Sequence, residues 1–135
     1  LIHDAARPFI DKDMIATVIK EAYSSGAAIT GVPVKATIKK VKRKKEKGKN
    51  KVYVSETIER DALYEIQTPQ AFKKDLIARA YASQGALEVT DDAMLVEKLG
   101  AKVAVVMGSY NNIKITTPED LVIAEAILKK GLCKV

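Results

Sequence analysis

The chain has little cysteine and lacks long hydrophobic runs. A single cysteine, Cys133, excludes a disulfide within the chain and any metal cluster built from several cysteines. No stretch approaches the roughly 18 apolar residues that a membrane-spanning helix needs. The N-terminus also lacks the charged and then apolar pattern of a signal segment. We therefore expect a cytoplasmic protein that makes no membrane contact.

The composition is that of one folded domain. The chain has 135 residues, of which 47% are hydrophobic and 30% charged, which argues against disorder and suits a single domain. The net charge of +6 comes from one segment. Residues 35–51 hold ten Lys or Arg and one Glu, or +9, whereas the other 118 residues hold 13 basic and 16 acidic residues, or −3.

Hydrophobic spacing predicts helices that alternate with strands. A helix capped by Asp11 and closed by Gly26 is followed by a buried strand over 27–34. Further helices are expected from Lys73 to Gly85, after a Thr90 cap, and from Thr117 onward. Short strands are expected over 101–108 and 111–116, and the stretch 60–72, which contains Pro69, is expected to be a loop. This order predicts a layered α/β fold with a mainly parallel sheet.

The basic segment lies within a predicted β-hairpin. Two alternating runs flank a polar tip that contains Gly48 and Asn50, and we place this arm at about residues 36–59 of a single domain that covers 1–135. An isolated hairpin is marginally stable in water, so the arm should pack on the domain or on a second chain. A nucleic-acid-binding module is an alternative, but Tyr53 is the only aromatic residue close to the tip, so we expect no specific nucleic-acid binding.

Three polar clusters follow predicted strands or adjoin them, at residues 3–8, 67–70 and 111–114. Ligands of open parallel sheets bind beyond the carboxyl ends of the strands. The clusters offer the carboxylate of Asp4, the guanidinium of Arg7 and the ammonium of Lys114, which suit phosphates and a divalent cation. A simple salt bridge within the loop is the alternative for Asp4 and Arg7. His3 has no second metal-binding side chain nearby, so we expect it to be structural.

Five motifs in order carry a family resemblance. The segments HDAARPF, VPVKATIKKV, TIERDALYEIQTPQAF, VTDDAMLVEKLG and NIKITTPEDLVIAEAIL resemble the C-terminal part of the 2-C-methyl-D-erythritol 4-phosphate cytidylyltransferase family. The related ribitol 5-phosphate cytidylyltransferases share the opening loop and the NIKIT-like strand. HDAARP and TIERDALY favour the erythritol branch, and the ribitol branch is the alternative.

The resemblance implies a Rossmann-like fold, a homodimer that joins through the hairpin arm, and transfer of CMP from CTP to 2-C-methyl-D-erythritol 4-phosphate with Mg²⁺. By matching positions, Asp4, Arg7 and Lys114 would be catalytic, and Asp4 would also help to place Mg²⁺. The substrate-binding residues implied in the same way, some of them reaching the partner subunit's site, are Thr37, Arg60, Thr68 and Thr90.

One part of the family pattern is missing from the sequence. The Gly-rich loop that grips the triphosphate of CTP has no counterpart here, and the chain opens without Met, as if at the end of a strand. We therefore expect that an N-terminal portion precedes Leu1 and that the chain alone has no transferase activity.

Overall fold

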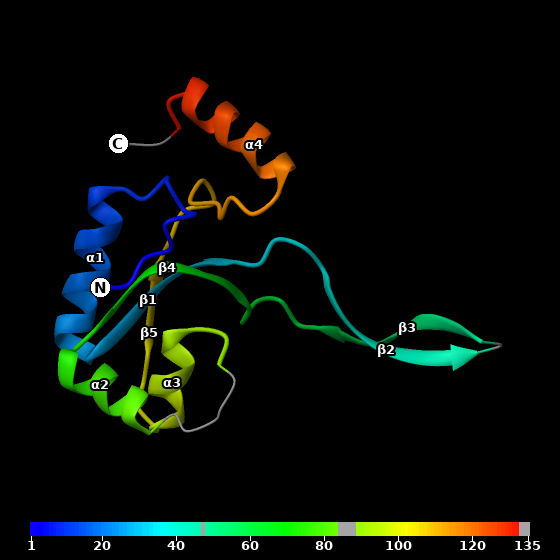
Figure 1. Ribbon diagram of the computed structural model, residues 1–135, viewed down its shortest axis with the longest axis horizontal. Helices are drawn as coiled ribbons and strands as arrows, with labels where there is room; N and C mark the ends of the chain where they lie inside the picture. The colour runs from blue at the N-terminus through cyan, green and yellow to red at the C-terminus, as the bar shows by residue number, and fades with distance from the viewer. Residues whose placement is uncertain (47, 84–88, 133–135) are drawn as a thin grey trace. The chain divides into compact units, whose positions relative to one another are not determined.

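The computed structural model describes residues 1–46, 48–83 and 89–132 (Figure 1). It divides into two compact units, one formed by Leu1–Val32 with Ile66–Val135 and the other by Pro33–Glu65. Cys133 and the expected helix end at Gly85 lie outside the described residues. None of the helices in the described residues has both the length and the hydrophobicity that a membrane span requires.

The first unit is built on a three-stranded sheet in the order β4-β1-β5. The central strand β1 (Ala27–Pro33) is buried along six of its seven residues, and it runs parallel to β5 (Ala104–Met107), with Ala28 opposite Ala104. Strand β4 (Tyr64–Phe72) forms the other edge, where Gln70 makes an antiparallel bridge to Ile2. The predicted layered α/β fold is confirmed, and β1 and β5 form the parallel pair of the predicted mainly parallel sheet.

Helices cover both faces of this sheet. Successive residues of a strand point to opposite faces, and on β1 Ala28 packs with helix α1 (Lys12–Ser25), whereas Ala27 packs with α2 (Lys74–Ala82) and α3 (Asp92–Lys98). Figure 1 shows α1 and the α2–α3 pair as separate layers around the strands. The last helix, α4 (Pro118–Lys129), packs through Ala124 and Ile127 on Phe9.

Capping residues fix where the helices begin. The Asp11 carboxylate accepts from the Met14 N–H, and Gly26 ends α1 at a φ of 95°, which favours glycine. Thr117 and Asp120 form a reciprocal capping box at α4. The predicted Thr90 cap is wrong by one residue, because Asp91 caps α3 and accepts from the Met94 N–H. A carboxylate caps as well as a hydroxyl does, so the sequence offered two equivalent choices.

Two predicted elements differ in the structure. Residues 64–72 form strand β4 and not a loop. Pro69, which follows a cis peptide bond, has no N–H group to donate to a neighbouring strand. This is tolerated because β4 lies at an edge of the sheet. Residues 111–116 are not a strand. Their alternating Ile113 and Ile115 pack against Phe9 and α4 and not within the sheet, so the alternation reflects burial on a helix.

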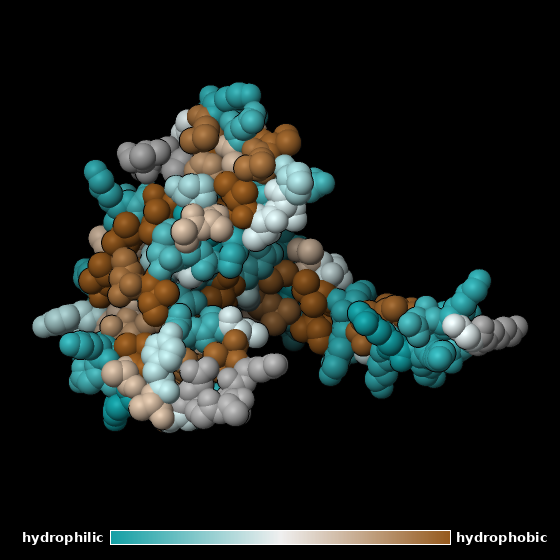
Figure 2. All heavy atoms as spheres, viewed as in Figure 1, coloured by the Kyte–Doolittle hydropathy of each residue, from teal (hydrophilic) through white to brown (hydrophobic). Residues whose placement is uncertain are grey.

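The second unit is the predicted hairpin. Strands β2 (Ile38–Glu46) and β3 (Lys49–Ile58) pair antiparallel, with a register shift between Lys40 and Val41. Figure 2 shows this hairpin as a mainly hydrophilic surface with hydrophobic side chains among the hydrophilic ones. The exposed hydrophobic residues include Val41, Val52 and Val54, which are 48–62% exposed. Within its own unit the hairpin therefore leaves hydrophobic surface open to solvent.

Candidate active site

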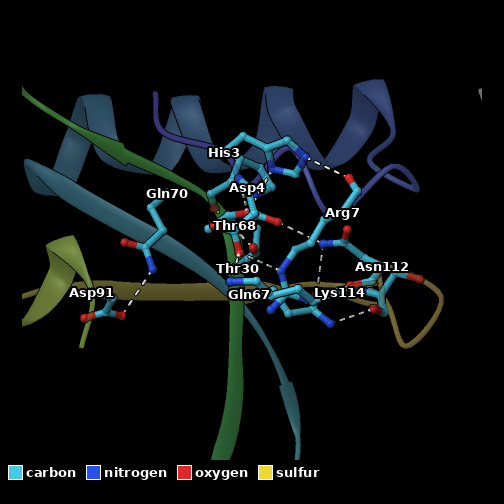
Figure 3. A network of polar contacts seen from close by, with 12 residues as sticks. His3, Asp4, Arg7, Thr30, Gln67, Thr68, Gln70, Asp91, Asn112 and Lys114 are labelled. Atoms are coloured by element: carbon cyan, nitrogen blue, oxygen red, sulfur yellow. Dashed lines mark hydrogen bonds and ion pairs between the residues drawn. The ribbon is translucent and has the colours of Figure 1, made fainter. Parts of the chain in front are cut away.

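Three charged side chains meet beyond the sheet (Figure 3). The Lys114 ammonium lies 3.0 Å from Asp4 Oδ2, and Arg7 Nε lies 3.4 Å from the same oxygen. Asp4 and Arg7 come from the opening loop and Lys114 from the loop after β5. The ammonium of Lys114 is the main cause that lowers the pKa of Asp4, with partial burial opposing it and Arg7 adding to it. The carboxylate is thus held ionised between two cations.

Thr68 joins this cluster from strand β4. Its hydroxyl accepts from the Asp4 N–H at 2.9 Å and lies 3.0 Å from His3 Nδ1. The other ring nitrogen of His3, Nε2, lies 2.9 Å from the Arg7 carbonyl, which can only accept, so Nε2 carries a proton and Nδ1 accepts from Thr68 when the ring is neutral. Both ring nitrogens of His3 are thus hydrogen-bonded within the protein, which is consistent with the structural role expected for it, and Thr68 Oγ1 retains one lone pair for a ligand.

The cluster opens into a cavity of about 320 Å³, which is within the size range of small-molecule sites. Its cationic side chains are Arg7 and Lys114, and its carboxylates come from both sides of the cavity. Figure 3 shows Asp91 and Gln70 apart from the group around Lys114. The lining residues are Ile2, Asp4, Arg7, Ile66, Gln67, Thr68, Gln70, Thr90, Asp91, Asp92 and Lys114.

The structure brings five of the seven predicted site residues to this cavity. Asp4, Arg7, Thr68, Thr90 and Lys114 line it, although they come from four separate stretches of the chain.

The other two predicted residues, Thr37 and Arg60, belong to the hairpin unit. Both are exposed, and Arg60 Nη1 donates to the Lys35 carbonyl at 2.7 Å. This bond uses one of the five guanidinium N–H groups. Their roles stay predictions.

Four further polar residues lie at or behind the cavity and are not among the predicted site residues. The carboxylate of Asp91 accepts from Gln70 Nε2 at 3.2 Å, and Asp92 accepts from the Tyr81 hydroxyl, which raises the pKa of that tyrosine. The amides of Gln67 and Asn112 are buried behind the charged cluster. For Gln67 and Asn112 the only signal was their place inside two of the polar clusters, because buried and exposed amides look alike in a sequence. Asp91 and Asp92 lie outside these clusters and directly follow the predicted Thr90.

The donors present fit a magnesium ion only in part. Mg²⁺ prefers oxygen ligands and is often held by one or two carboxylates plus substrate phosphates and water. Asp4 can supply one carboxylate, since Lys114 and Arg7 both engage Oδ2. Among the described residues there is no group of three His, Cys, Asp or Glu side chains that could hold a metal. The site therefore suits a cation that arrives with phosphates.

Similarity to known proteins covers most of the chain. Residues 1–130 match the family model of 2-C-methyl-D-erythritol 4-phosphate cytidylyltransferase. The relative of that name from Alkaliphilus oremlandii is 53% identical over 131 residues, and the one from Alkaliphilus metalliredigens is 50% identical over 132 residues. Each match covers 96% of this chain and 52% of the relative. The chain thus spans about half the length of the curated relatives it matches.

Solved structures agree with the sequence comparison. The crystal structure of 2-C-methyl-D-erythritol 4-phosphate cytidylyltransferase from Thermus thermophilus superposes with a TM-score of 0.81 at 39% identity, over 96% of this chain and 61% of that one. The structure of a 4-diphosphocytidyl-2C-methyl-D-erythritol synthase from Anaerococcus prevotii superposes with a TM-score of 0.81 at 40% sequence identity. The match covers 94% of this chain and 55% of that one. These likenesses favour the erythritol branch over the ribitol branch and confirm a Rossmann-like fold. The chain belongs to the 2-C-methyl-D-erythritol 4-phosphate cytidylyltransferase family.

Proposed function

We propose that this chain supplies the substrate side of a site that transfers CMP from CTP to 2-C-methyl-D-erythritol 4-phosphate, releasing pyrophosphate, in isoprenoid biosynthesis. The observation that carries the proposal is the contact of Lys114 with Asp4 beside Arg7 and Thr68, in a member of this family. The same cavity presents Arg7 and Lys114 around Asp4 on one part of its wall, and Asp91 lies apart from them on another (Figure 3). That suits a ligand with a phosphate at one end and hydroxyl groups at the other.

The proposed chemistry is positioning and charge neutralisation. When the phosphate of the sugar attacks the α-phosphate of CTP, two anions must approach each other, and fixed cations lower the barrier. Lys114 is a compact point charge for this purpose. Its side chain is about half exposed, so the ammonium can turn from Asp4 toward a phosphate. Asp4 and Arg7 stay bound to each other and shape the cavity wall. A phosphate dianion needs no general base, which agrees with the lack of an activated nucleophile among the described residues that line the cavity.

Carboxylates and hydroxyls would orient the polyol. Thr68 offers its remaining lone pair to a hydroxyl, and Thr90, Asp91 and Asp92 line the same cavity. Ionised carboxylates accept strong hydrogen bonds from hydroxyl groups. Asp4 would hold Mg²⁺ together with the phosphates, and the ion would supply further charge neutralisation there when bound.

We also propose that the hairpin joins two copies of the chain. Its valines 41, 52 and 54 are exposed within their unit, and a lone hairpin is marginally stable, so burial against a second arm would stabilise both. Thr37 and Arg60 would then serve the partner's site, with Arg60 binding the substrate phosphate through two parallel hydrogen bonds. The cytoplasmic location and the lack of specific nucleic-acid binding stay predictions.

The test uses a chimera in which this chain replaces the matching segment of the Alkaliphilus oremlandii relative. We expect it to release pyrophosphate from CTP only when the sugar phosphate is present, and we expect the chain alone to release none. In the chimera, Arg60→Ala should raise the KM for the sugar phosphate more than that for CTP, and Arg43→Ala on strand β2 is the control. An unchanged KM for the sugar phosphate would refute the assignment of Arg60, and a chimera that folds without turnover would contradict the proposed function.

A further inference from the structure

A buried amide side chain holds the loop that carries Lys114. Strand β5 ends at Met107, and the Gly108 N–H donates to the Gly31 carbonyl at 2.8 Å. At the next residue, the side chain of Gln67 on strand β4 makes the hydrogen bonds to the main chain. Its Nε2 donates to the Ser109 carbonyl at 2.8 Å, and its Oε1 accepts from the Ser109 N–H at 3.3 Å. The Gln67 amide thus bonds to both main-chain groups of one residue, as a neighbouring strand would.

Asn112 connects this loop to two other segments (Figure 3). Its side chain is 0% exposed, and Nδ2 donates to the Thr68 carbonyl at 2.9 Å and lies 3.3 Å from Gln67 Oε1. The Asn112 carbonyl accepts from Arg7 Nη1 at 2.8 Å. A carbonyl oxygen can only accept, so the contact with Thr68 fixes which end of the amide is the nitrogen. One residue therefore ties the opening loop, strand β4 and the Lys114 loop together.

The main chain is fixed on both sides of Lys114. Asn112 precedes it by two residues, and the Ile115 N–H donates to the Ala6 carbonyl at 2.8 Å. The Lys114 side chain itself is 47% exposed, so the protein controls its ammonium mainly through the position of the backbone. A displacement of about 1 Å from a reactive geometry can cost about a hundredfold in rate.

We infer that Asn112 is a positioning residue of the transfer site: its buried amide and its carbonyl together set where Lys114 and Arg7 stand relative to Asp4 and Thr68. The effect of Asn112 on the reaction rate rests on the proposed function. Its effect on the positions of Lys114 and Arg7 rests only on the contacts described above. Asn112 is not among the residues that line the cavity, so it acts through Lys114 and Arg7 and does not touch the substrate.

The first experiment measures the position of Lys114 without any need for activity. A carbodiimide joins a carboxylate to an amine that is in contact with it, so treatment of the 135-residue chain should give an Asp4–Lys114 amide that mass spectrometry of peptides can quantify. We expect this product in the unmodified chain and its loss in Asn112→Ala. If Asn112→Ala does not fold, Asn112→Ser removes the same amide with a smaller change in volume and should give the same loss.

The matched control is Thr30→Val. Thr30 is also 0% exposed, and its hydroxyl donates to the Pro69 carbonyl, next to Thr68, at 3.1 Å. This variant removes one buried hydrogen bond to strand β4 without touching the Lys114 loop. We expect it to be destabilised while the Asp4–Lys114 product still forms. An undiminished product in a folded Asn112→Ala, or an equal loss in Thr30→Val, would overturn the inference.

The second experiment tests the catalytic consequence in the chimera. Asn112→Ala should lower kcat by about tenfold to a hundredfold with a smaller change in either KM. Once Lys114→Ala is present, it should cost much less, because only its effect through Arg7 remains. A residue that only stabilises the fold would lower activity by the same factor in both backgrounds, so additive losses would refute the positioning role. A chimera without activity would count against the proposed function. The crosslink would still decide whether Asn112 positions Lys114, because it requires no turnover.

Discussion

Replacing Gly108 by alanine tests the packing on which the Lys114 loop depends. A Cβ atom at this position would lie 2.4 Å from Gln67 Oε1, where ordinary contact is 3.4–4 Å, so the oxygen must move by about 1 Å. It accepts from Ser109 N and Asn112 Nδ2 at 3.3 Å each, and such a shift would break at least one of these bonds. Overpacking and a buried polar group that loses its partner each cost about 1–3 kcal/mol, and we expect Gly108→Ala to lower the free energy of unfolding by about 3 kcal/mol.

The assay is urea unfolding of the unmodified chain, Gly108→Ala, Gln67→Ala and the double variant, which together form a double-mutant cycle. Gln67→Ala removes the atoms that the new methyl group would meet, apart from the Gly31 carbonyl at 3.3 Å. In that background Gly108→Ala should cost less than about 1 kcal/mol, since the remaining overlap is small. Equal costs in both backgrounds would refute the reasoning, because the penalty would then come from the backbone and not from Gln67.

Three further predictions concern single contacts. Lys114→Ala should raise the pKa of Asp4 toward its ordinary value in a carbon-13 titration of the carboxyl group, since the ammonium is the main cause of the lowering; an unchanged pKa would rule that out. The lowered pKa means that Asp4 stabilises the fold above about pH 4, its unfolded value, and that this contribution is lost as the pH falls through the folded pKa. In Lys114→Ala the loss on acidification should therefore be smaller, as measured by urea unfolding at pH 6 and pH 3. Thr117→Ala should lower the free energy of unfolding by about 1 kcal/mol, because it removes the α4 cap, whereas Thr17→Ala on the exposed side of α1 should cost less.

Local signals in the sequence were enough for most of the helices. Asp11 and Gly26 bound α1, and Thr117 with Pro118 opens α4, because capping depends on residues within one turn. The burial of strand β1 also followed from its unbroken hydrophobic run. These features needed no information about distant parts of the chain.

The errors arose where distant contacts decide the structure. Pro69 indicates a loop if only its neighbours are considered, but the edge position of β4 accommodates it in a strand. Ile113 and Ile115 alternate as in a strand, yet they pack on α4. The charged members of the site could be found because phosphate chemistry requires cations. The amides of Gln67 and Asn112 could not, because their role depends on burial and on three segments meeting.

Lys114 is the proposed cation that stabilises CMP transfer. The most direct measurement is pyrophosphate release from CTP and 2-C-methyl-D-erythritol 4-phosphate by the chimera, with Lys114→Ala compared with Lys102→Ala, an exposed lysine that does not line the cavity. We predict that Lys114→Ala lowers kcat by about a hundredfold to a thousandfold and that Lys102→Ala leaves it unchanged. Equal rates for the two variants would show that Lys114 is not this cation.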